Sequence, residues 1–304
     1  MTTQVRIYQM DAFTHIPFGG NPAGVVPEAD GLTPDQMQKI AREMNCSETA
    51  FVCSTDTPGA DLRVRFFTPS EEIDLCGHAT ISTFIALGME NRFGTDLPLT
   101  VVQETNVGLL PVMLSRSEAG QIRALMTQAP PQFRECDLSR REAAQMIGLE
   151  EGDIDSDLPI GLAYTGVWDL FVPIKTVEAF KRMKPQTSRI AAQNRSIGVA
   201  STHCYSFDTI EESSHLHTRD FSPAVGIAED PATGTANGAL GAFLLRHGVL
   251  VPKGERLQLL VEQGFEIGRP SFLSVEVDGE PNSPRTVRVG GTAVQILQGM
   301  MTFA

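Results

Sequence analysis

The sequence predicts a mixed α/β protein built from two similar lobes. Its length, its mixture of helix and strand patterns, and an internal repeat support this prediction. The chain has 304 residues, and a single hydrophobic core stops growing at roughly 250–300 residues, so two domains are expected. Apolar residues make up 41% of the chain and charged residues 20%. This composition is sufficient to form cores and excludes a disordered chain.

Charge and cysteine content exclude several classes of protein. The formal charge of −13 argues against nucleic acid or an anionic membrane as partner, since both attract basic surfaces. No apolar run reaches the roughly 18–20 residues of a membrane span. The opening residues MTTQVRIYQMDAF are typical of a strand and lack the pattern of a signal peptide. An odd number of scattered cysteines favours a reducing, cytoplasmic location; they are Cys46, Cys53, Cys76, Cys136 and Cys204.

In the first half, a helix is predicted over residues 33–44. Thr33 can cap it, Pro34 suits the first helical position, and Gln36 completes a capping-box spacing. Two strand patterns follow, TAFVCST and LRVRFFT, joined by a turn. The segment EEIDLCGHATISTFIALG then predicts a short acidic loop that leads into an apolar helix ending near Gly88.

The second half repeats this plan. Capping-box spacing between Ser139 and Glu142 predicts one helix, and TVEAFKRMK predicts another. RSIGVAST and HLHTRDFS are interpreted as strands, followed by an acidic loop and an apolar helix in SPAVGIAEDPATGTANGALGAFLLRHG. The final segments LSVEVDG, TVRVGG and AVQILQG predict a strand meander whose last member returns to the first lobe.

An alignment of residues 67–69 with 221–223, both Phe-(Thr/Ser)-Pro, shows the repeat directly. It also pairs residues of the same type, namely Leu62 with Leu216, Arg65 with Arg219 and Ile73 with Ile227. We therefore expect one lobe from residues 1–120 with 292–304, and a second from residues 121–291.

Two duplicated lobes that face each other would place equivalent loops on opposite walls of one cleft. These loops are Cys76-Gly77-His78 and residues 230–235, and each opens a helix. Helix N-termini have unpaired N–H donors and bind carboxylate or phosphate. Small residues let a ligand approach the backbone; they are Gly77, Ala79, Gly234, Thr235 and Ala236.

Three side chains in these segments are candidates for proton transfer. Glu48, near a helix C-terminus and an apolar strand, is expected to have a raised pKa suited to a general acid or base, although a solvated loop acid is the structural alternative. Asp230 precedes a helix and could act as its N-cap. His78 could transfer a proton or cap the helix start.

Metal and nucleotide chemistry are less well supported. A thiolate would be stabilised at Cys76, at the entrance of a helix. The Cys76-x-His78 spacing is typical of zinc, but no second ligand pair accompanies it. His215 and His217 lie on one strand and are expected to face solvent. TGTANG matches neither phosphate-binding fingerprint. No metal and no cofactor are therefore expected, which favours proton transfer by side chains.

Several long motifs in order resemble the phenazine-biosynthesis isomerase-like (PhzF) family. They include DAFTHIPFGGNPAGVV, MQKIAREMNCSETAFV, RFFTPSEEIDLCGHAT and DFSPAVGIAEDPATGTANGALGAFLLRHG. The resemblance implies the diaminopimelate-epimerase-like fold, in which two α/β lobes each wrap a curved sheet around a central helix and enclose the active site. It also implies a homodimer, no cofactor and a small carboxylic acid as substrate.

The resemblance carries roles onto individual positions. Glu48 matches the catalytic carboxylate, and His78 and Asp230 match its supporting polar residues. The matches for substrate binding are Ser47, Gly77, Gly234 and Thr235, and possible accessory residues are Cys76 and Asn21. The resemblance implies an isomerase that moves a proton between carbons.

Two other functions remain open at this point. One is an epimerase or racemase that sets Cys76 or Asp230 opposite Glu48, although the position of the second thiol in two-cysteine enzymes reads Asp230-Pro231-Ala232. The other is an interaction protein that has kept the fold and lost the chemistry.

Overall fold

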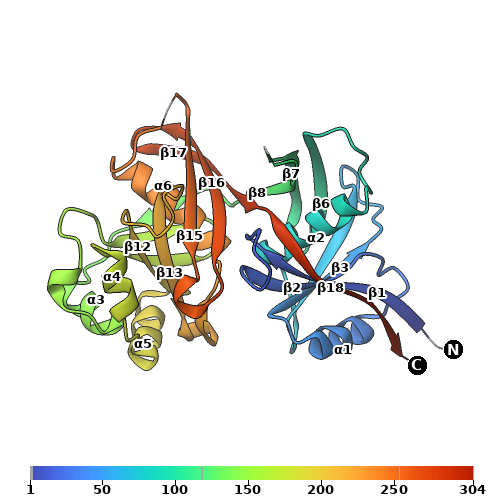
Figure 1. The fold of residues 1–304 in the computed structure, drawn as a ribbon, viewed down its shortest axis with the longest axis horizontal. Helices are drawn as coiled ribbons and strands as arrows, with labels where there is room; N and C mark the ends of the chain where they lie inside the picture. Colours follow the sequence, from blue (N-terminus) through green and yellow to red (C-terminus); the bar gives the residue numbers. More distant parts are fainter. Residues whose placement is uncertain (1–2, 118, 253, 304) are drawn as a thin grey trace. The chain divides into compact units, whose positions relative to one another are not determined.

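The computed structural model describes residues 3–117, 119–252 and 254–303. It divides into two compact units (Figure 1). Unit 1 comprises Met1–Thr127 and Gly290–Ala304, and unit 2 comprises Gln128–Val289. The sequence placed these boundaries near 120 and 292. Among the described residues, no helix combines the length and apolar character that crossing a membrane requires.

Unit 1 contains one mixed sheet in the order β18-β1-β2-β3-β4-β6-β7-β8. The β2/β3 and β4/β6 pairs are parallel, the others in this order are antiparallel, and β5 pairs with β4. The strands are β1 (Thr3–Ala12), β2 (Asn21–Val26), β3 (Glu48–Cys53), β4 (Leu62–Phe67), β5 (Glu72–Ile73), β6 (Leu99–Thr105), β7 (Gly108–Arg116), β8 (Ile122–Thr127) and β18 (Ala293–Phe303). The first predicted strand is thus confirmed from residue 3; residues 1 and 2 lie outside the described residues.

Two helices pack on this sheet. The predicted capping box at Thr33 and Gln36 is present and starts α1 (Pro34–Met44), whose apolar face packs on Phe51 and Phe67. The second helix, α2 (Gly77–Met89), is buried at every position from residue 79 to 87 and packs against β1, β2, β3 and β8. Because α2 is buried on all sides, it forms the core of unit 1 rather than its surface.

Unit 2 repeats the strand pattern of unit 1. Its sheet runs β9-β10-β11-β12-β13-β15-β16, with parallel pairs at β11/β12 and β13/β15, and β14 pairs with β13 as β5 does with β4. The strands are β9 (Gln132–Arg134), β10 (Gly161–Tyr164), β11 (Trp168–Pro173), β12 (Ser201–Ser206), β13 (Leu216–Ser222), β14 (Ile227–Asp230), β15 (Arg256–Gln263), β16 (Ser271–Glu280) and β17 (Ser283–Gly291). The duplication seen in the sequence is therefore a duplication of topology.

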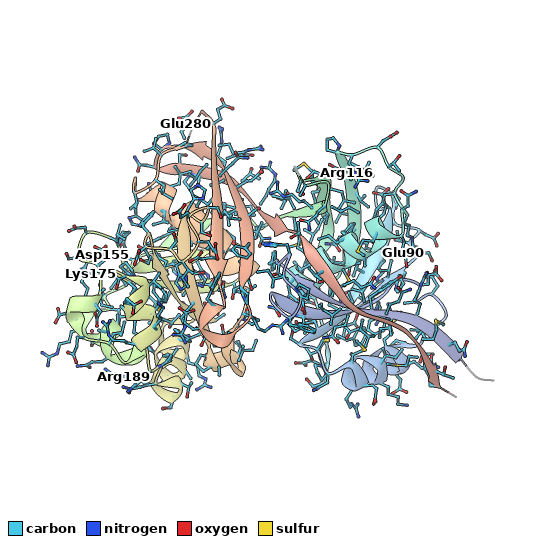
Figure 2. All side chains as sticks on the ribbon, viewed as in Figure 1. Glu90, Arg116, Asp155, Lys175, Arg189 and Glu280 are labelled. Atoms are coloured by element: carbon cyan, nitrogen blue, oxygen red, sulfur yellow. The ribbon has the colours of Figure 1, made fainter. Side chains whose placement is uncertain are left out.

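The helices of unit 2 form two groups. The buried α6 (Gly234–Arg246) corresponds to α2 and packs against β10, β11, β15 and β16. A second core lies under α3 (Arg140–Ile147), α4 (Val177–Arg182) and α5 (Thr187–Ile197). Short 3₁₀ turns occur at η1 (Glu151–Asp153), η2 (Pro223–Val225) and η3 (Phe265–Ile267). Exposed ionic side chains such as Arg189 and Glu280 extend outward from unit 2 (Figure 2).

Two sequence-based predictions for unit 2 are wrong. Residues 195–202 were expected to form a strand, but α5 continues to Ile197 and ends at Gly198, whose φ of 68° is readily adopted by glycine. The strand begins only at Ser201. Ile197 therefore ends a helix, and Ile197 and Val199 pack on the core of unit 2.

The second error concerns the two histidines near β13. His215 is exposed, as expected, but His217 is fully buried. The ring of Phe180, from α4, lies 4.7 Å from the His217 ring and covers that face of the strand. The matching strand of unit 1 alternates between buried and half-buried positions, so the repeat could not predict this burial.

Candidate active site

In unit 1, Glu48 and His78 form an ion pair at the start of α2. His78 Nε2 lies 3.0 Å from Glu48 Oε2, and the two side chains are only 12% and 15% exposed. Glu48 is the first residue of β3, and His78 is the second residue of α2. The end of a strand and the beginning of the buried helix therefore bring together two residues that are thirty positions apart.

Ser47 and Cys76 complete this cluster. The Ser47 hydroxyl lies 3.2 Å from His78 Nε2, and Cys76 Sγ lies 3.4 Å from His78 Nδ1. Cys76 is the N-cap residue of α2 but makes no capping hydrogen bond through its side chain. Its sulfur is therefore oriented toward the imidazole.

Burial and the ion pair set the charge states of the cluster. Burial raises the pKa of Glu48, but the His78 charge and hydrogen bond outweigh it and lower that pKa to about 2. Burial also lowers the pKa of His78, and the neighbouring Cys76 and Glu48 raise it well above 6.5. Burial and the Glu48 charge raise the pKa of Cys76. The resulting species are a carboxylate, an imidazolium and a neutral thiol.

These directions correct two sequence-based expectations. The pKa of Glu48 was expected to be raised, because the sequence showed its apolar neighbours but not its cationic partner. Cys76 was expected to be a stabilised thiolate at a helix entrance, whereas burial next to Glu48 disfavours the anion. The ion pair between Glu48 and His78, and not burial alone, therefore decides which of these side chains carries a proton.

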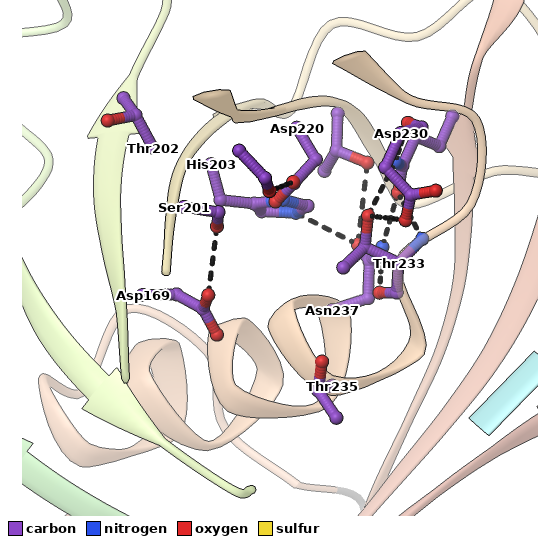
Figure 3. Close-up of polar contacts among 12 residues, drawn as sticks. Asp169, Ser201, Thr202, His203, Asp220, Asp230, Thr233, Thr235 and Asn237 are labelled. Carbon is purple, nitrogen blue, oxygen red and sulfur yellow. Dashed lines mark hydrogen bonds and ion pairs between the residues drawn. The ribbon is translucent and has the colours of Figure 1, made fainter. Parts of the chain in front are cut away.

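The corresponding region of unit 2 surrounds Asp230, the last residue of β14. The Thr233 hydroxyl donates a 2.6 Å hydrogen bond to Asp230 Oδ2 (Figure 3). Thr233, and not Asp230, is the N-cap residue of α6, and its side chain makes no capping bond. Of the two roles left open for Asp230, the N-cap role is therefore excluded; Asp230 instead accepts a hydrogen bond from the hydroxyl of the capping residue.

A buried polar network supports this loop. Asn237 Nδ2 donates to the Thr233 carbonyl and to Gln263 Oε1, and Gln263 Nε2 donates to the Asp230 carbonyl. On the opposite side, Asn237 Oδ1 lies 3.3 Å from His203 Nε2, whose other nitrogen lies 2.9 Å from Asp220 (Figure 3). The loop is therefore fixed from within the core of unit 2.

The sequence did not single out these supporting residues. Asn237 stands alone as a large polar residue in the buried part of α6, four positions after Thr233. This spacing allows a side chain to reach the carbonyl of the preceding turn. A fully buried amide in an apolar helix is itself a signal, because such groups need hydrogen-bond partners. The partners His203 and Gln263 come from distant strands and left no local pattern.

The remaining candidate residues lie at the helix starts and nearby. Gly77 and Gly234 are the first residues of α2 and α6. Thr235 follows Gly234, and its carbonyl accepts a hydrogen bond from Thr165. Asn21 begins β2 and is buried. In each unit the candidate carboxylate and the start of the buried helix belong to one local cluster.

Comparison with known proteins identifies the family. The family model described as phenazine biosynthesis-like protein matches residues 10–299. The uncharacterized isomerase YfhB of Bacillus subtilis is 37% identical over 292 residues, covering 96% of either chain. Trans-2,3-dihydro-3-hydroxyanthranilate isomerase of Pseudomonas fluorescens is 34% identical over 294 residues, covering 97% of this chain and 98% of that protein.

A solved structure gives the same result. The Bacillus anthracis phenazine biosynthesis protein of the PhzF family matches with a TM-score of 0.87 and 38% identity, covering 98% of this chain and 99% of that one. The expected diaminopimelate-epimerase-like fold is confirmed. On these matches, the chain belongs to the phenazine biosynthesis-like (PhzF) family and is an isomerase of that family.

Proposed function

We propose that this isomerase moves a proton between carbons of a small carboxylic acid without a cofactor, with Glu48 as the general acid and base. The observation that supports this most directly is the Glu48–His78 ion pair at a helix start that has no side-chain cap. Of the relatives, the Pseudomonas fluorescens protein is named for an anthranilate derivative, which is a carboxylic acid.

The start of α2 suits an anionic substrate. The first hydrogen bond along the helix runs from Thr80 N to the Cys76 carbonyl, so the preceding N–H groups, at Gly77 and His78, have no partner within the helix. The helix dipole adds roughly half a positive charge at this end. A substrate carboxylate is the group that these donors accommodate best.

In the proposed reaction, proton transfer starts from these charge states. The Glu48 carboxylate takes a proton from a carbon next to an electron-withdrawing group and becomes a neutral acid. It then gives that proton to a different carbon, while the His78 imidazolium stabilises the negative charge that develops between the two steps. Glu48 ends as a carboxylate again, so a single residue completes the cycle.

The proposal also includes Asp230 and Thr235 of unit 2 as supporting residues. This assignment rests on the family resemblance and on the duplicated local geometry, in which Asp230 lies beside the start of α6 as Glu48 lies beside that of α2. The same resemblance supports a homodimer, which light scattering on the purified chain would test.

Isotope exchange tests the role of Glu48. The chain is incubated with candidate carboxylic acids in deuterated water, and label at carbon is followed by NMR. We expect Glu48→Gln to lower the exchange rate by about 10²–10⁴-fold, the usual contribution of a general acid–base group. Glu43→Gln, an exposed glutamate on α1, serves as the matched control. Exchange that survives Glu48→Gln unchanged contradicts the assignment.

A two-base epimerase is the second candidate, and the contact between Cys76 and His78 favours it. It predicts inversion at one stereocentre, with label incorporated at that same carbon. Alkylation of Cys76, or Cys76→Ala, would then abolish turnover, whereas exchange by Glu48 alone persists. The raised pKa of Cys76 counts against the thiol as a base at neutral pH. An interaction protein without chemistry would show no exchange with any of the acids.

A further inference from the structure

A series of hydrogen-bonded side chains connects the core of unit 2 to Asp230 (Figure 3). We call these side chains the donor chain, and they are His203, Asn237, Gln263 and Thr233. The first three are fully buried. Because buried polar groups need hydrogen-bond partners, the position of each partner shows which atom donates and which accepts.

Backbone groups fix the orientation of the two amides. A carbonyl only accepts and an N–H only donates, so the Gln263 atom 2.8 Å from the Asp230 carbonyl is Nε2, and the atom 3.2 Å from Thr233 N is Oε1. Asn237 Nδ2 then donates to Gln263 Oε1 at 2.7 Å and to the Thr233 carbonyl at 3.0 Å. The atom of Asn237 that faces His203 is therefore Oδ1, an acceptor.

This orientation sets the protonation of the His203 ring. Its Nε2 lies 3.3 Å from Asn237 Oδ1, and its Nδ1 lies 2.9 Å from Asp220 Oδ2. The other oxygen of Asp220 accepts a 2.6 Å hydrogen bond from the Ser222 hydroxyl, so both of its oxygens act as acceptors. Since imidazole is a stronger base than a carboxylate, the geometry places a hydrogen on each ring nitrogen and makes the pair an imidazolium and a carboxylate.

The other end of the donor chain sets the direction of the Thr233 hydroxyl. Gln263 Nε2 donates to Thr233 Oγ1 at 3.1 Å, so the hydroxyl hydrogen points away from Gln263 and is donated to Asp230 Oδ2 at 2.6 Å. Every hydrogen bond between His203 and Asp230 therefore has its donor on the His203 side. Hydrogen bonds aligned in this way polarise and strengthen one another, most of all inside a protein.

We infer that His203 is a positioning residue: as an imidazolium, it holds Asp230 in one orientation through the donor chain. It acts through other side chains and is not a catalytic residue. The charge of His203 and the direction of the donor chain stand on the geometry alone. The effect on turnover rests on the proposed function, in which Asp230 is a supporting residue.

Nitrogen NMR tests the charge of His203. The full chain is labelled with ¹⁵N-histidine, and the His203 signals are those lost in His203→Asn or in His203→Gln. At pH 7 we expect a one-bond N–H doublet on both ring nitrogens. His217 is the reference within the same spectrum, because its two ring nitrogens face Glu262 and Glu266. A His203 ring with only one protonated nitrogen contradicts the inference.

Exchange kinetics test the effect on turnover, with the carboxylic acid that passes the isotope-exchange test above. His203→Asn keeps a donor for Asp220 but loses the one for Asn237, and Thr233→Val loses the hydroxyl but keeps its shape. We expect each to slow exchange by about 10–100-fold, the equivalent of one hydrogen bond to a charged group. The double variant should be no slower than the slower single variant, since both changes interrupt one chain.

Two further variants separate this role from a loss of stability. His203→Gln keeps a donor for Asn237 and should exchange faster than His203→Asn. Thr202→Val, on the same strand, loses a buried hydrogen bond to Asn194 outside the donor chain, and should lower stability without slowing exchange. Circular dichroism establishes the folded fraction of each variant, and rates are expressed per folded molecule.

Two kinetic results would overturn the positioning role. One is a rate for His203→Asn equal to that of Thr202→Val, and the other is a double variant whose loss is the product of the two single losses. If no acid shows Glu48-dependent exchange, the proposed function fails, and the effect on turnover fails with it. The NMR spectrum of the wild-type chain still decides the charge of His203 in that case.

Discussion

Replacement of His217 by glutamine should strongly destabilise unit 2. The fully buried His217 ring lies 2.8 Å from Glu262 and 2.9 Å from Glu266, and these carboxylates are 0% and 8% exposed. Burial lowers the pKa of His217, but its hydrogen bonds to both glutamates outweigh this effect and raise it above the ordinary 6.5. The substitution therefore leaves two carboxylates without their shared cation.

The loss in free energy of unfolding caused by His217→Gln depends on the hydrogen bonds that the two glutamates keep. Loss of one member of a buried ion pair typically costs about 3–5 kcal/mol. Glu262 keeps two hydrogen bonds from the backbone N–H groups of Ile210 and Glu211, which places the expected loss at the lower end, about 3 kcal/mol. In a unit of this size, each kcal/mol lowers the melting temperature by about 2–4 °C. We expect a fall of about 6–12 °C.

The pH dependence identifies the cause. Because its folded pKa is raised, His217 contributes its full stabilisation below pH 6.5 and loses it as the pH rises through the folded pKa. Burial raises the pKa of Glu262 and of Glu266, but the bonds to His217 lower both below 4.5. Their stabilisation is present above pH 4.5 and is lost on acidification. The difference between wild type and variant should be widest between about pH 4.5 and 6.5.

Differential scanning calorimetry from pH 4 to pH 9 measures this difference. His215→Gln, two residues earlier and exposed, is the control and should cost about 1 kcal/mol or less. The reasoning would be refuted if His217→Gln lowered the melting temperature by less than 2 °C, or by the same amount at every pH.

Three further predictions concern stability. Burial and the Asp220 charge raise the pKa of Asp169 well above 3.8, so the wild-type protein loses stability as the pH rises above that value. The melting temperature of Asp169→Asn, measured relative to wild type, should therefore rise between pH 4 and pH 8. A difference in melting temperature that stays constant over this range contradicts the prediction. Thr33→Ala removes a capping box and should lower the free energy of unfolding, measured in urea, by about 1 kcal/mol. A negligible change in that free energy would contradict the prediction. Gly241→Ala sets a methyl 2.9 Å from Val275 and should cost about 1–3 kcal/mol by the same measurement; a stabilised variant would show that the sheet yields.

Local patterns predicted the parts of the fold that depend on neighbours in sequence. The capping boxes at Thr33 and Ser139 begin α1 and α3 as expected. The aligned repeat anticipated equivalent β3–β4 and β12–β13 pairs. In these cases a few adjacent side chains set the backbone conformation, so the sequence alone carries the information.

Properties that depend on distant residues were less accessible. The sequence placed Glu48 among apolar neighbours, but the direction of its pKa shift depends on His78, thirty residues later. His217 is buried because α4 covers its strand, and at the corresponding place, between β2 and β3, unit 1 has the single helix α1 in place of the α4–α5 pair. Asp230 also lies beside Thr233 because their side chains are hydrogen-bonded, and helix-capping preferences alone do not predict that bond. Each miss is a tertiary contact that overrides a local preference.

The pairing of β1 with β18 has a consequence for synthesis of the chain. Thr3 to Ala12 pair with β18, which begins only at Ala293, so the sheet of unit 1 cannot be complete until β18 has left the ribosome. All of unit 2, Gln128–Val289, is made in between, which takes roughly ten to thirty seconds at synthesis rates of about 5–20 residues per second. During that interval β1 exposes a hydrogen-bonding edge, and the second half of the duplication can fold before the first.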